Sequence, residues 1–438
     1  MAGTAPRSLT IRTYHVGFGD CFLLSFAYAK GAERHVLIDY GSTGLPPKTP
    51  KTRMMDIAND IKKRSGGKLH AIVATHRHKD HISGFETRKN GKGTGDVIRT
   101  LKPDLVVQPW TEDPKLGTKA TGPAGGSGKK VALAPGNHQQ VAMLASMQAV
   151  AGATLLQTRS TRYFNKELRD QFHFLGESNI NNPAAVKNLM TMGKKAEYVF
   201  AGKKTALEKV IPGVKVDVLG PPTVKQTATI KKQRARDPNE FWQLQARSMD
   251  AGAAGSGAGG EVLFPKHVRS RGPRFPVDAR WLIYHARNIR GDNLLQIVRM
   301  LDKAMNNTSV ILLMRVGKLS LLFPGDAQIE NWQYALDNKN VRKMLAGVDV
   351  YKVGHHGSLN ATPKTLWESF AKKSKDKAKK SRLRTLMSTM EHKHGSEESH
   401  TEVPRNTLVS ALKTQSELFS TQQLTGSSFF HDTVVKFS

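Results

Sequence analysis

A run of metal-binding residue types that directly follows an apolar segment constrains this chain more than any other feature. Residues 71–75 (AIVAT) are apolar or β-branched, and the next six residues contain three histidines and one aspartate. His76 and His78 are two positions apart, so they project to the same side of an extended chain and can share one ion. A turn after them would direct Asp80 and His81 toward a second position. Imidazole and carboxylate ligands together suit zinc, manganese or iron better than calcium, so the run predicts a metal site at a strand end.

Two later segments repeat this arrangement of an apolar strand followed by ligand residues. Residues 321–327 (LLFPGDA) place Asp326 at the end of an apolar run, where an oxygen that bridges two metals would be needed. Residues 353–358 (VGHHGS) place His355 and His356 after another apolar run. Because the carboxyl ends of strands in an α/β sheet gather at one rim, the three segments predict a single shared site.

Hydrophobic periodicity along the chain predicts an α/β fold. The first part alternates short apolar runs with turns and contains one segment with helical spacing. We expect strands at 9–14, 21–28, 35–39, 71–75, 310–316, 319–324 and 348–353, with helices at 51–64, 138–151, 182–192, 329–336 and 364–372. A final strand, helix and strand pair is expected over 384–438. The order of strands, helix and strand in both halves suggests two similar halves that face each other.

Three segments read as insertions into one domain that spans residues 1–438. Residues 117–136 are rich in Gly, Ala and Lys, and residues 225–260 begin with basic residues and end in AGAAGSGAGG, which is too poor in side chains to pack a core. Residues 266–290 combine several arginines with Trp281 and Tyr284. We therefore predict a single domain with basic, Gly-rich insertions at about 111–136 and 225–290.

A net charge of +31 favours a polyanionic partner, with nucleic acid first among the candidates. Part of the excess lies in the run KKSKDKAKKSRLR at 372–384, and part lies in the insertion at 266–290. Either segment can contact phosphates, and the second can also stack on bases. The alternatives are a solvated basic face for the first segment and an ordinary surface insertion for the second. The predicted nucleic-acid contacts are Lys372, Lys373, Arg382, Arg384, Arg271 and Arg274.

Cysteine usage and hydropathy bear on the compartment. The one cysteine, Cys21, lies in an apolar run, where we expect a buried structural thiol. The first residues contain no apolar stretch of secretory length, and no run of about 18 apolar residues occurs. We therefore expect a cytoplasmic protein that does not span a membrane. The sequence does not predict its oligomeric state.

Taken together, these motifs resemble the metallo-β-lactamase superfamily. The resemblance is strongest to its ComEC-like branch, the hydrolase domain of bacterial DNA-uptake channels and its stand-alone relatives. The matching segments run almost from end to end and leave only the middle insertions unmatched. They are HVGFGDC at 15–21, LIDYG at 37–41, THRHKDH at 75–81, VLGPP at 218–222, NNTSV at 306–310, FPGDA at 323–327, KVGHHGS at 352–358, and the closing segments at 419–421 and 434–435.

The resemblance implies a four-layered αββα sandwich with one or two zinc ions, or manganese, at the rim. His76 and His78 would bind the first metal, and Asp80 and His81 the second. Asp326 would bridge both metals, and Asp39 would orient the ligand loop by hydrogen bonds.

The resemblance leaves open which residue of the HHGS segment completes the second site. Our working assignment places His355 on the metal and gives catalysis to His356 and Ser358, together with Asp80. The second histidine and Ser358 would contact a phosphate oxygen or protonate a leaving group.

The chain departs from the wider superfamily where a further histidine would bind the first metal. That segment contains Asn306 and Asn307, as in the ComEC-like branch, so the first site is short of one strong ligand. His285 or His138 could take its place. Occupancy by one metal, and by manganese in place of zinc, is therefore open.

Two other segments have alternative interpretations. His15 and Phe18 replace Asp and Gln of the branch's first motif, a change expected to alter packing or substrate fit near the glycine turn. The segment EHKH at 391–394, with His400, is either a substrate contact, a second metal site or ordinary loop chemistry.

The resemblance implies hydrolysis, in which a metal-bound hydroxide attacks a phosphorus or carbonyl centre. Together with the basic charge, it favours a phosphodiesterase or nuclease that acts on nucleic acid. A hydrolase of a small phosphoester, lactone or thioester is the alternative within catalysis, because a fold alone does not determine the substrate. A nucleic-acid-binding protein with a weakened site is the alternative from another class.

Overall fold

The structure is a computed structural model that describes residues 5–116, 120, 122–123, 182–227, 304–358, 362–394, 402–425 and 428–437. Contacts divide the chain into two compact units, and the described residues except Ala304 belong to the first, which comprises Met1–Val141, Asn182–Lys231 and Met305–Ser438. Most of the predicted insertions and the predicted helix at 138–151 lie outside the described residues. The prediction of a single domain therefore stays a prediction.

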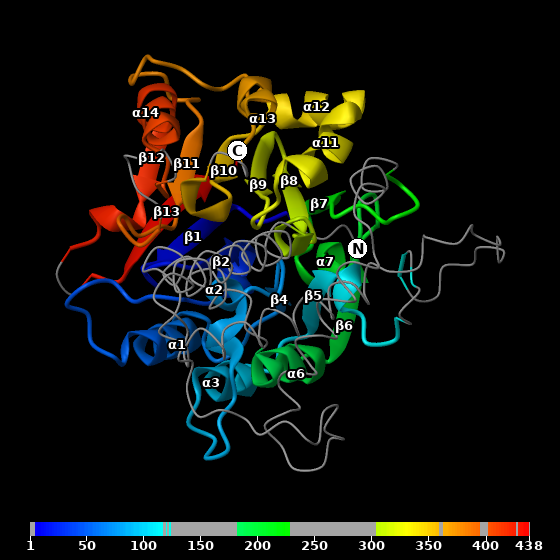
Figure 1. Ribbon diagram of the computed structural model, residues 1–438, viewed down its shortest axis with the longest axis vertical. Helices are drawn as coiled ribbons and strands as arrows, with labels where there is room; N and C mark the ends of the chain where they lie inside the picture. Colours follow the sequence, from blue (N-terminus) through cyan, green and yellow to red (C-terminus); the bar gives the residue numbers. More distant parts are fainter. Residues whose placement is uncertain are drawn as a thin grey trace, which may run out of the picture. The chain divides into compact units, whose positions relative to one another are not determined.

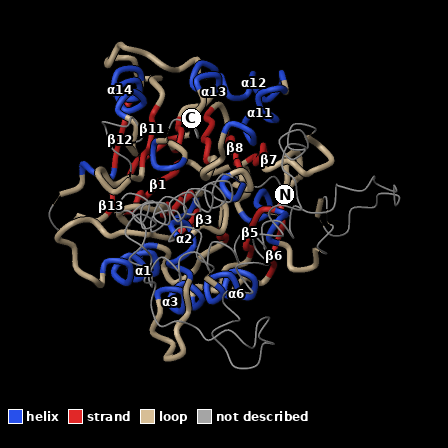
Figure 2. The backbone as a smooth tube through the Cα atoms, viewed as in Figure 1, coloured by secondary structure: helices blue, strands red, loops and turns tan. Residues whose placement is uncertain are grey.

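The described part of the chain is an α/β fold with two mixed β-sheets (Figures 1 and 2). The first sheet has the strand order β13-β1-β2-β3-β4-β5-β6 and the second β12-β11-β10-β9-β8-β7. The strands of the first sheet are β1 (Ser8–Tyr14), β2 (Cys21–Ala27), β3 (Glu33–Tyr40), β4 (Ala71–Val73), β5 (Leu105–Pro109), β6 (Lys195–Val199) and β13 (Phe430–Lys436). Those of the second are β7 (Lys215–Gly220), β8 (Ile311–Val316), β9 (Leu319–Phe323), β10 (Val350–Lys352), β11 (Arg384–Met387) and β12 (Glu417–Ser420).

Alternating side chains place each sheet between two hydrophobic clusters, as the two-residue period of a strand requires. In β2, Leu24 faces the cluster shared by both sheets, and Leu23 faces the helices outside the first sheet. In β8, Leu312 faces the shared cluster and Leu313 faces the helices outside the second sheet. Both faces of each sheet are therefore buried, which explains why these strands read as nearly continuous apolar runs.

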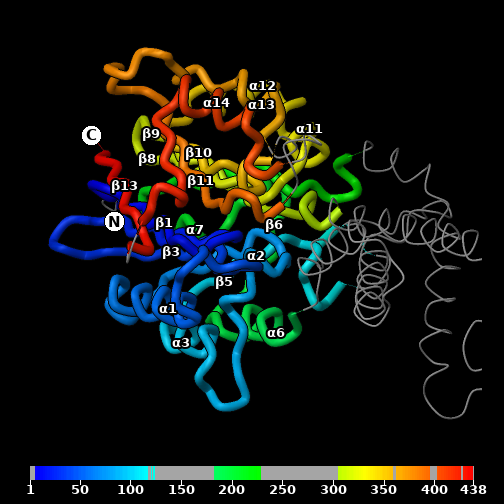
Figure 3. Tube along the Cα trace, turned by 60° about the vertical axis from the view of Figure 1, so that its left-hand side comes forward, coloured from blue at the N-terminus to red at the C-terminus, as the bar shows by residue number. Residues whose placement is uncertain are grey.

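Most helices cover the outer face of one of the sheets, and Figure 3 shows these on opposite sides of the two sheets, whereas the helix Leu207–Val210 packs into the cluster between the sheets. Helix α1 packs through Ile57, Ala58 and Ile61, which recur at helical spacing. The described helices are α1 (Arg53–Arg64), α2 (Lys79–Ile82), α3 (Thr94–Thr100), α6 (Pro183–Thr191), α7 (Leu207–Val210), α11 (Ile329–Asp337), α12 (Lys339–Ala346), α13 (Lys364–Ser369) and α14 (Asn406–Gln415). Short 3-10 turns are η1 (Ala29–Gly31), η2 (Ser83–Phe85), η3 (Trp110–Glu112), η4 (His355–Gly357) and η5 (Thr421–Gln423). None of the described helices is long and apolar enough to cross a membrane.

Most strands and helices predicted in the described residues are confirmed, with ends shifted by a few residues. The predicted closing strand pair is wrong in one respect. Strand β12 joins β11 in the second sheet, whereas β13 returns to pair with β1 in the first sheet, so the two last strands lie in different sheets. Strands β5, β6 and β7 and helices α2, α3, α7 and α12 were not predicted, and each of them is at most eight residues long.

The parallel part of each sheet determines where the ligand segments meet. Strands β3, β4, β5 and β6 are parallel in the first sheet, and β9, β10, β11 and β12 are parallel in the second. The residues after β4, β9 and β10 are the three ligand segments predicted from the sequence. As expected for parallel strands, they leave the sheets at one rim.

Candidate metal centre

The position of His81 is determined by a carboxylate at the end of β3. Asp39 accepts a hydrogen bond from the Thr75 backbone N–H (2.7 Å) and one from the Thr75 hydroxyl (2.7 Å). His81 Nδ1 lies 2.8 Å from Asp39 Oδ2, and because a carboxylate only accepts, Nδ1 is the donor. The other ring nitrogen, Nε2, is then turned toward Asp326 Oδ2 at 3.0 Å. The predicted orienting role of Asp39 agrees with these contacts, which are those of the partners of metal-bound histidines.

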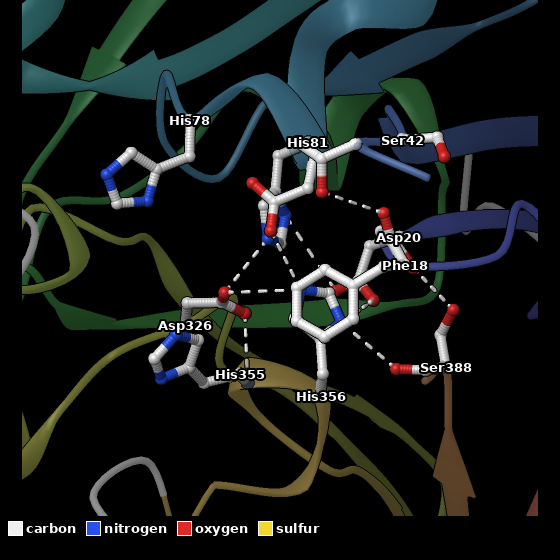
Figure 4. A network of polar contacts seen from close by, with 12 residues as sticks. Phe18, Asp20, Ser42, His78, His81, Asp326, His355, His356 and Ser388 are labelled. Atoms are coloured by element: carbon white, nitrogen blue, oxygen red, sulfur yellow. Dashed lines mark hydrogen bonds and ion pairs between the residues drawn. The ribbon is translucent and has the colours of Figure 1, made fainter. Parts of the chain in front are cut away.

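His356 is oriented in the same way by a main-chain carbonyl. Its Nδ1 lies 3.0 Å from the Ser388 carbonyl oxygen, which can only accept, so Nδ1 carries the proton. Its Nε2 lies 2.9 Å from Asp80 Oδ2. His356 is completely buried, and Figure 4 shows its ring and the His81 ring turned toward the Asp326 carboxylate.

The working assignment of the histidine pair is therefore reversed. His355 lies beside the centre with its backbone N–H donating to Asp326 Oδ1 at 2.9 Å, while its ring Nδ1 lies 2.9 Å from the Ser358 hydroxyl. His356, not His355, belongs with the ligand group. Both neighbours adopt a left-handed backbone, with φ of 42° and 52°, so the alternation of an extended strand does not tell which of the two rings faces the centre.

Four buried side chains form the candidate site, and their ligand atoms all lie within 4.8 Å of one another. They offer two imidazole nitrogens and two carboxylates, a donor set that suits zinc or manganese. Asp80 Oδ1 is buried and has no hydrogen-bond partner, which is costly for a carboxylate oxygen unless a cation binds it. The residues thus fit a divalent transition metal. The four are Asp80, His81, Asp326 and His356.

Two predicted ligands of the first metal lie beside this group but do not join it. His76 Nε2 lies 3.0 Å from His78 Nδ1, and the His76 and His81 ring centroids are 4.1 Å apart. Both His76 and His78 are buried, and Figure 4 shows His78 set apart from the rings of His81 and His356. Burial and the neighbouring His81 lower the pKa of His76 well below its usual range, so its imidazole stays neutral. The described residues therefore give the second predicted metal position more ligands than the first.

Electrostatics concentrate attraction for a cation at the group of four. Burial lowers the pKa of His81, but Asp326 and Asp39 raise it more, so it lies well above its usual range. Burial also lowers the pKa of His356, but the Asp80 and Asp326 carboxylates raise it more, so this pKa is raised overall. Burial raises the pKa of Asp80, but His81 and His356 lower it more, and the carboxylate stays ionised. A divalent ion bound here would displace the protons that the two imidazoles otherwise attract.

Two charged residues that the sequence analysis did not assign lie directly behind the group. Lys352, the last residue of β10, forms a buried ion pair with Asp20 of the first glycine motif, and its Nζ lies 3.4 Å from Asp326 Oδ1. Burial lowers the pKa of Lys352, but Asp20 and Asp326 raise it by more, so the side chain stays a charged ammonium. The sequence feature that could have indicated Lys352 is a lysine at the end of an apolar strand, directly before a motif rich in possible ligands. Removing one partner of such a pair costs about 3–5 kcal/mol.

Glycines let the motifs at the ends of β1, β3 and β4 approach each other. A Cβ added at Gly19 would lie 2.2 Å from the Gly41 carbonyl oxygen, and one added at Gly41 would lie 2.4 Å from the Asp80 carbonyl carbon. The backbone N–H of Asp20 donates to the Asp80 carbonyl at 3.0 Å, and the Gly41 N–H donates to the Asp20 carbonyl at 3.0 Å. These contacts fix the ligand loop against the first two motifs.

The two residues that depart from the branch's first motif, His15 and Phe18, are both buried. The Phe18 ring lies 4.2 Å from those of both His356 and His394. Burial and Lys393 lower the pKa of His394 to about 2, so it stays neutral. Burial also lowers the pKa of His15, to about 4. Phe18 thus packs against the ring of His356, one of the four candidate ligands.

The remaining alternatives from the sequence are only partly placed by the structure. His394 lies near the centre, whereas His392 is exposed and His400 is outside the described residues. His138 and His285, the proposed substitutes for the missing ligand, also lie outside them.

The basic run does not lie at the centre. Arg384 is the first residue of β11, and Ser388, which contacts His356, follows the last, so the run precedes the opposite end of this strand. Its predicted nucleic-acid contacts have internal partners instead. Lys372 pairs with Asp349, Lys373 lies over Trp367, Arg382 donates to the Ser374 and Thr414 carbonyls, and Arg384 pairs with Glu417. Arg271 and Arg274 lie outside the described residues.

The sequence was compared with models of known protein families and with curated proteins, and it matches none of them. The geometry of the centre and the motifs are therefore the basis on which a function can be inferred.

Proposed function

We propose that this chain is a metal-dependent hydrolase of the metallo-β-lactamase superfamily, in its ComEC-like branch, and that it cleaves phosphodiester bonds in nucleic acid. The observation that carries the proposal is the inward orientation of His81 and His356. Each ring donates through Nδ1 to a fixed acceptor and turns Nε2 toward buried carboxylates, so either a proton on each Nε2 or one bound cation must lie between them. Buried acceptors that face one another with neither a proton nor a cation between them would be strongly unfavourable, and a divalent cation can replace both protons.

The fold supports the assignment to this superfamily. The order of helices, first sheet, second sheet and helices corresponds to the αββα sandwich that the motifs imply. The ligands follow β4, β9 and β10, which are the strand ends where the motifs predict them.

In this proposal, Asp80, His81, Asp326 and His356 hold one zinc or manganese ion, and His76 with His78 offers a weaker second position. A bound ion would supply a Lewis acid and lower the pKa of water near the substrate. The chain itself orients the ligands through Asp39 and the Ser388 carbonyl. Oriented, buried donors of this kind cost no rearrangement during reaction.

His355 and Ser358 are the groups we assign to the substrate. They lie 2.9 Å apart through Ser358 Oγ and His355 Nδ1, next to the ligand Asp326 but outside the group of four. A hydroxyl and an imidazole can donate to a phosphate oxygen or pass a proton to a leaving group. The net charge of +31 supports an anionic substrate, and the buried Cys21 fits the cytoplasmic location that we include in the proposal.

A small phosphoester is the second candidate substrate, and the position of the basic run favours it. Lys372, Lys373, Arg382 and Arg384 have internal partners at the far end of β11, so these residues do not form a track for a nucleic-acid backbone at the centre. A small substrate would need only the groups beside the ligands.

The deciding experiment measures hydrolysis by purified protein with added zinc or manganese. The substrates are single-stranded DNA, double-stranded DNA, RNA and bis-(p-nitrophenyl) phosphate, with small phosphomonoesters, lactones and thioesters as a second panel. The control is Asp80→Ala, which removes a ligand. We expect metal-dependent cleavage of phosphodiesters that the control lacks.

The other hypotheses give different results in the same experiment. Cleavage of the second panel alone would replace the leading proposal with the small-substrate one. Salt-dependent DNA binding that persists in Asp80→Ala and Asp326→Ala, without turnover of any substrate, would favour a binding protein with a weakened site.

A further inference from the structure

The buried ion pair of Lys352 and Asp20 contacts the candidate metal centre from behind. Lys352 Nζ makes its closest contact with Asp20 Oδ2, and it lies 3.1 Å from the Gly325 carbonyl oxygen and 3.4 Å from Asp326 Oδ1. Both charged side chains are almost completely buried. The lysine thus faces two carboxylates, and one of them belongs to the ligand group.

The two oxygens of Asp326 have different neighbours. Oδ1 accepts the His355 N–H at 2.9 Å and lies beside the lysine, so the protein holds it. Oδ2 lies 3.0 Å from His81 Nε2 and 3.9 Å from His356 Nε2, within the ligand group. Only Oδ2 is directed to the position where a cation would bind.

An ammonium and a divalent cation compete for the same carboxylate, and at buried positions the competition is strong. Asp20 lies where it can decide this competition. Its Oδ1 is 3.7 Å from His356 Nδ1 and its Oδ2 is 3.8 Å from His81 Nδ1, so it sits behind both rings without joining the group of four. Among the described carboxylates, only Asp20 and Asp326 lie within 4.0 Å of Lys352 Nζ.

We propose that Asp20 is a positioning residue that draws the Lys352 ammonium away from Asp326 and thereby leaves Asp326 available to a divalent cation. The inference rests on the proposed function, because it concerns the same centre. Without the Asp20 carboxylate, the ammonium pairs with Asp326 alone and weakens cation binding. Without both charges, Asp326 is again available.

The test is a double-mutant cycle on the full chain. Asp20→Asn, Lys352→Met, the double variant and wild type are stripped with a chelator, and Mn²⁺ binding is measured by titration calorimetry. We expect Asp20→Asn to weaken Mn²⁺ binding at least about tenfold, and the double variant to return to within about threefold of wild type. The matched control is Asp104→Asn, which removes the carboxylate partner of Lys68 ahead of β5 and should leave Mn²⁺ binding unchanged.

Unchanged Mn²⁺ binding in Asp20→Asn, or a double variant as weak as Asp20→Asn, overturns the inference alone. Wild-type protein that binds neither Mn²⁺ nor Zn²⁺ overturns the proposed function and the inference with it. If Asp20→Asn does not fold, the melting temperatures in chelator decide. The melting temperature of Lys352→Met should be lower than that of wild type. Adding Asp20→Asn to Lys352→Met should raise the melting temperature again. A double variant that melts no higher than Lys352→Met contradicts the proposal.

Discussion

His355 and His356 are adjacent in sequence, yet their side chains contact different groups. His356 Nε2 faces Asp80 from a completely buried ring, whereas the His355 ring pairs with Ser358. Both residues have a left-handed backbone, a conformation that asparagine also tolerates. Asparagine substitutions therefore remove each ring without adding strain.

We predict that His356→Asn weakens Mn²⁺ or Zn²⁺ binding more than about a hundredfold, since loss of a mere orienting partner already costs roughly 10–100-fold. His355→Asn should leave metal affinity within about threefold of wild type and lower kcat instead. Titration of chelator-stripped protein, followed by turnover at saturating metal, separates the two effects. The matched control is His431→Asn, because the His431 ring is stacked on Phe419 away from the centre. Equal loss of metal affinity in both variants would contradict the assignment.

At the scale of elements, the approach of the motif loops leaves no room for side chains. The Cβ of an alanine at position 41 would lie 2.4 Å from the Asp80 carbonyl carbon and 2.5 Å from the His81 nitrogen. Both atoms belong to backbone at the start of α2, so the ligand loop itself must shift.

We predict that Gly41→Ala lowers the free energy of unfolding by about 3 kcal/mol and also weakens metal binding, because overpacking here moves ligands. Gly347→Ala is the control. Its added Cβ would meet only the Met344 carbonyl oxygen at 3.5 Å, an ordinary contact, so the change should stay within about 0.5 kcal/mol. Chemical denaturation in chelator and metal titration measure the two effects. Wild-type metal affinity in Gly41→Ala would show that the ligand loop can shift without moving the ligands, and would contradict this prediction.

The elements that carry ligands could be predicted because each follows an apolar run that is buried on both faces. The segments around His76, Asp326 and His356 met as expected, since parallel strands share a rim. The pattern could not show which of two adjacent histidines faces inward, because a left-handed backbone has no two-residue period. The pairing of Lys352 with Asp20 could not be predicted either, since it joins distant segments from different sheets.

At the scale of the whole molecule, two buried histidines link stability to pH. His35 Nδ1 lies 2.9 Å from the Ser25 hydroxyl, and the backbone N–H of His35 donates to His70 Nδ1 at 3.0 Å. Burial is the main cause that lowers the pKa of both rings from 6.5 to about 4. Between these pH values the unfolded chain binds more protons than the fold, so stability is full above pH 6.5 and is lost as the pH falls toward 4.

We predict a loss on the order of 2 kcal/mol across this window from the two histidines together. The variant His70→Asn keeps an acceptor near the position of Nδ1 but does not titrate. It should therefore reduce the slope of unfolding free energy against pH between 6.5 and 4, while stability at pH 8 stays close to wild type. Urea denaturation at several pH values, in chelator so that the metal centre contributes equally, provides the measurement. An unchanged slope would show that other groups cause the acid sensitivity.

The position of a positive charge, more than its contribution to the net charge of +31, should determine its effect on an anionic substrate. Lys377, Lys379 and Lys380 are exposed in the run before β11, at the end of that strand opposite Ser388. The Lys393 side chain lies close to Gly44. Gly44 forms a β-bridge with Phe18, whose ring contacts that of His356. Fields of exposed charges are screened beyond about 8 Å in physiological salt, so the distant lysines should act weakly at the centre.

We therefore predict that replacing all three distant lysines with glutamine changes the KM for a phosphodiester by less than about twofold at physiological salt, because their field is screened. Lys393→Gln removes one charge but should raise KM about threefold to tenfold, the cost of one charge-assisted contact. Steady-state kinetics at two salt concentrations check both results, and the effect of Lys393→Gln should shrink at the higher one. A larger effect from the three distant lysines would mean that a long polyanion crosses the second sheet's far end, and would favour nucleic acid over a small phosphoester as the substrate.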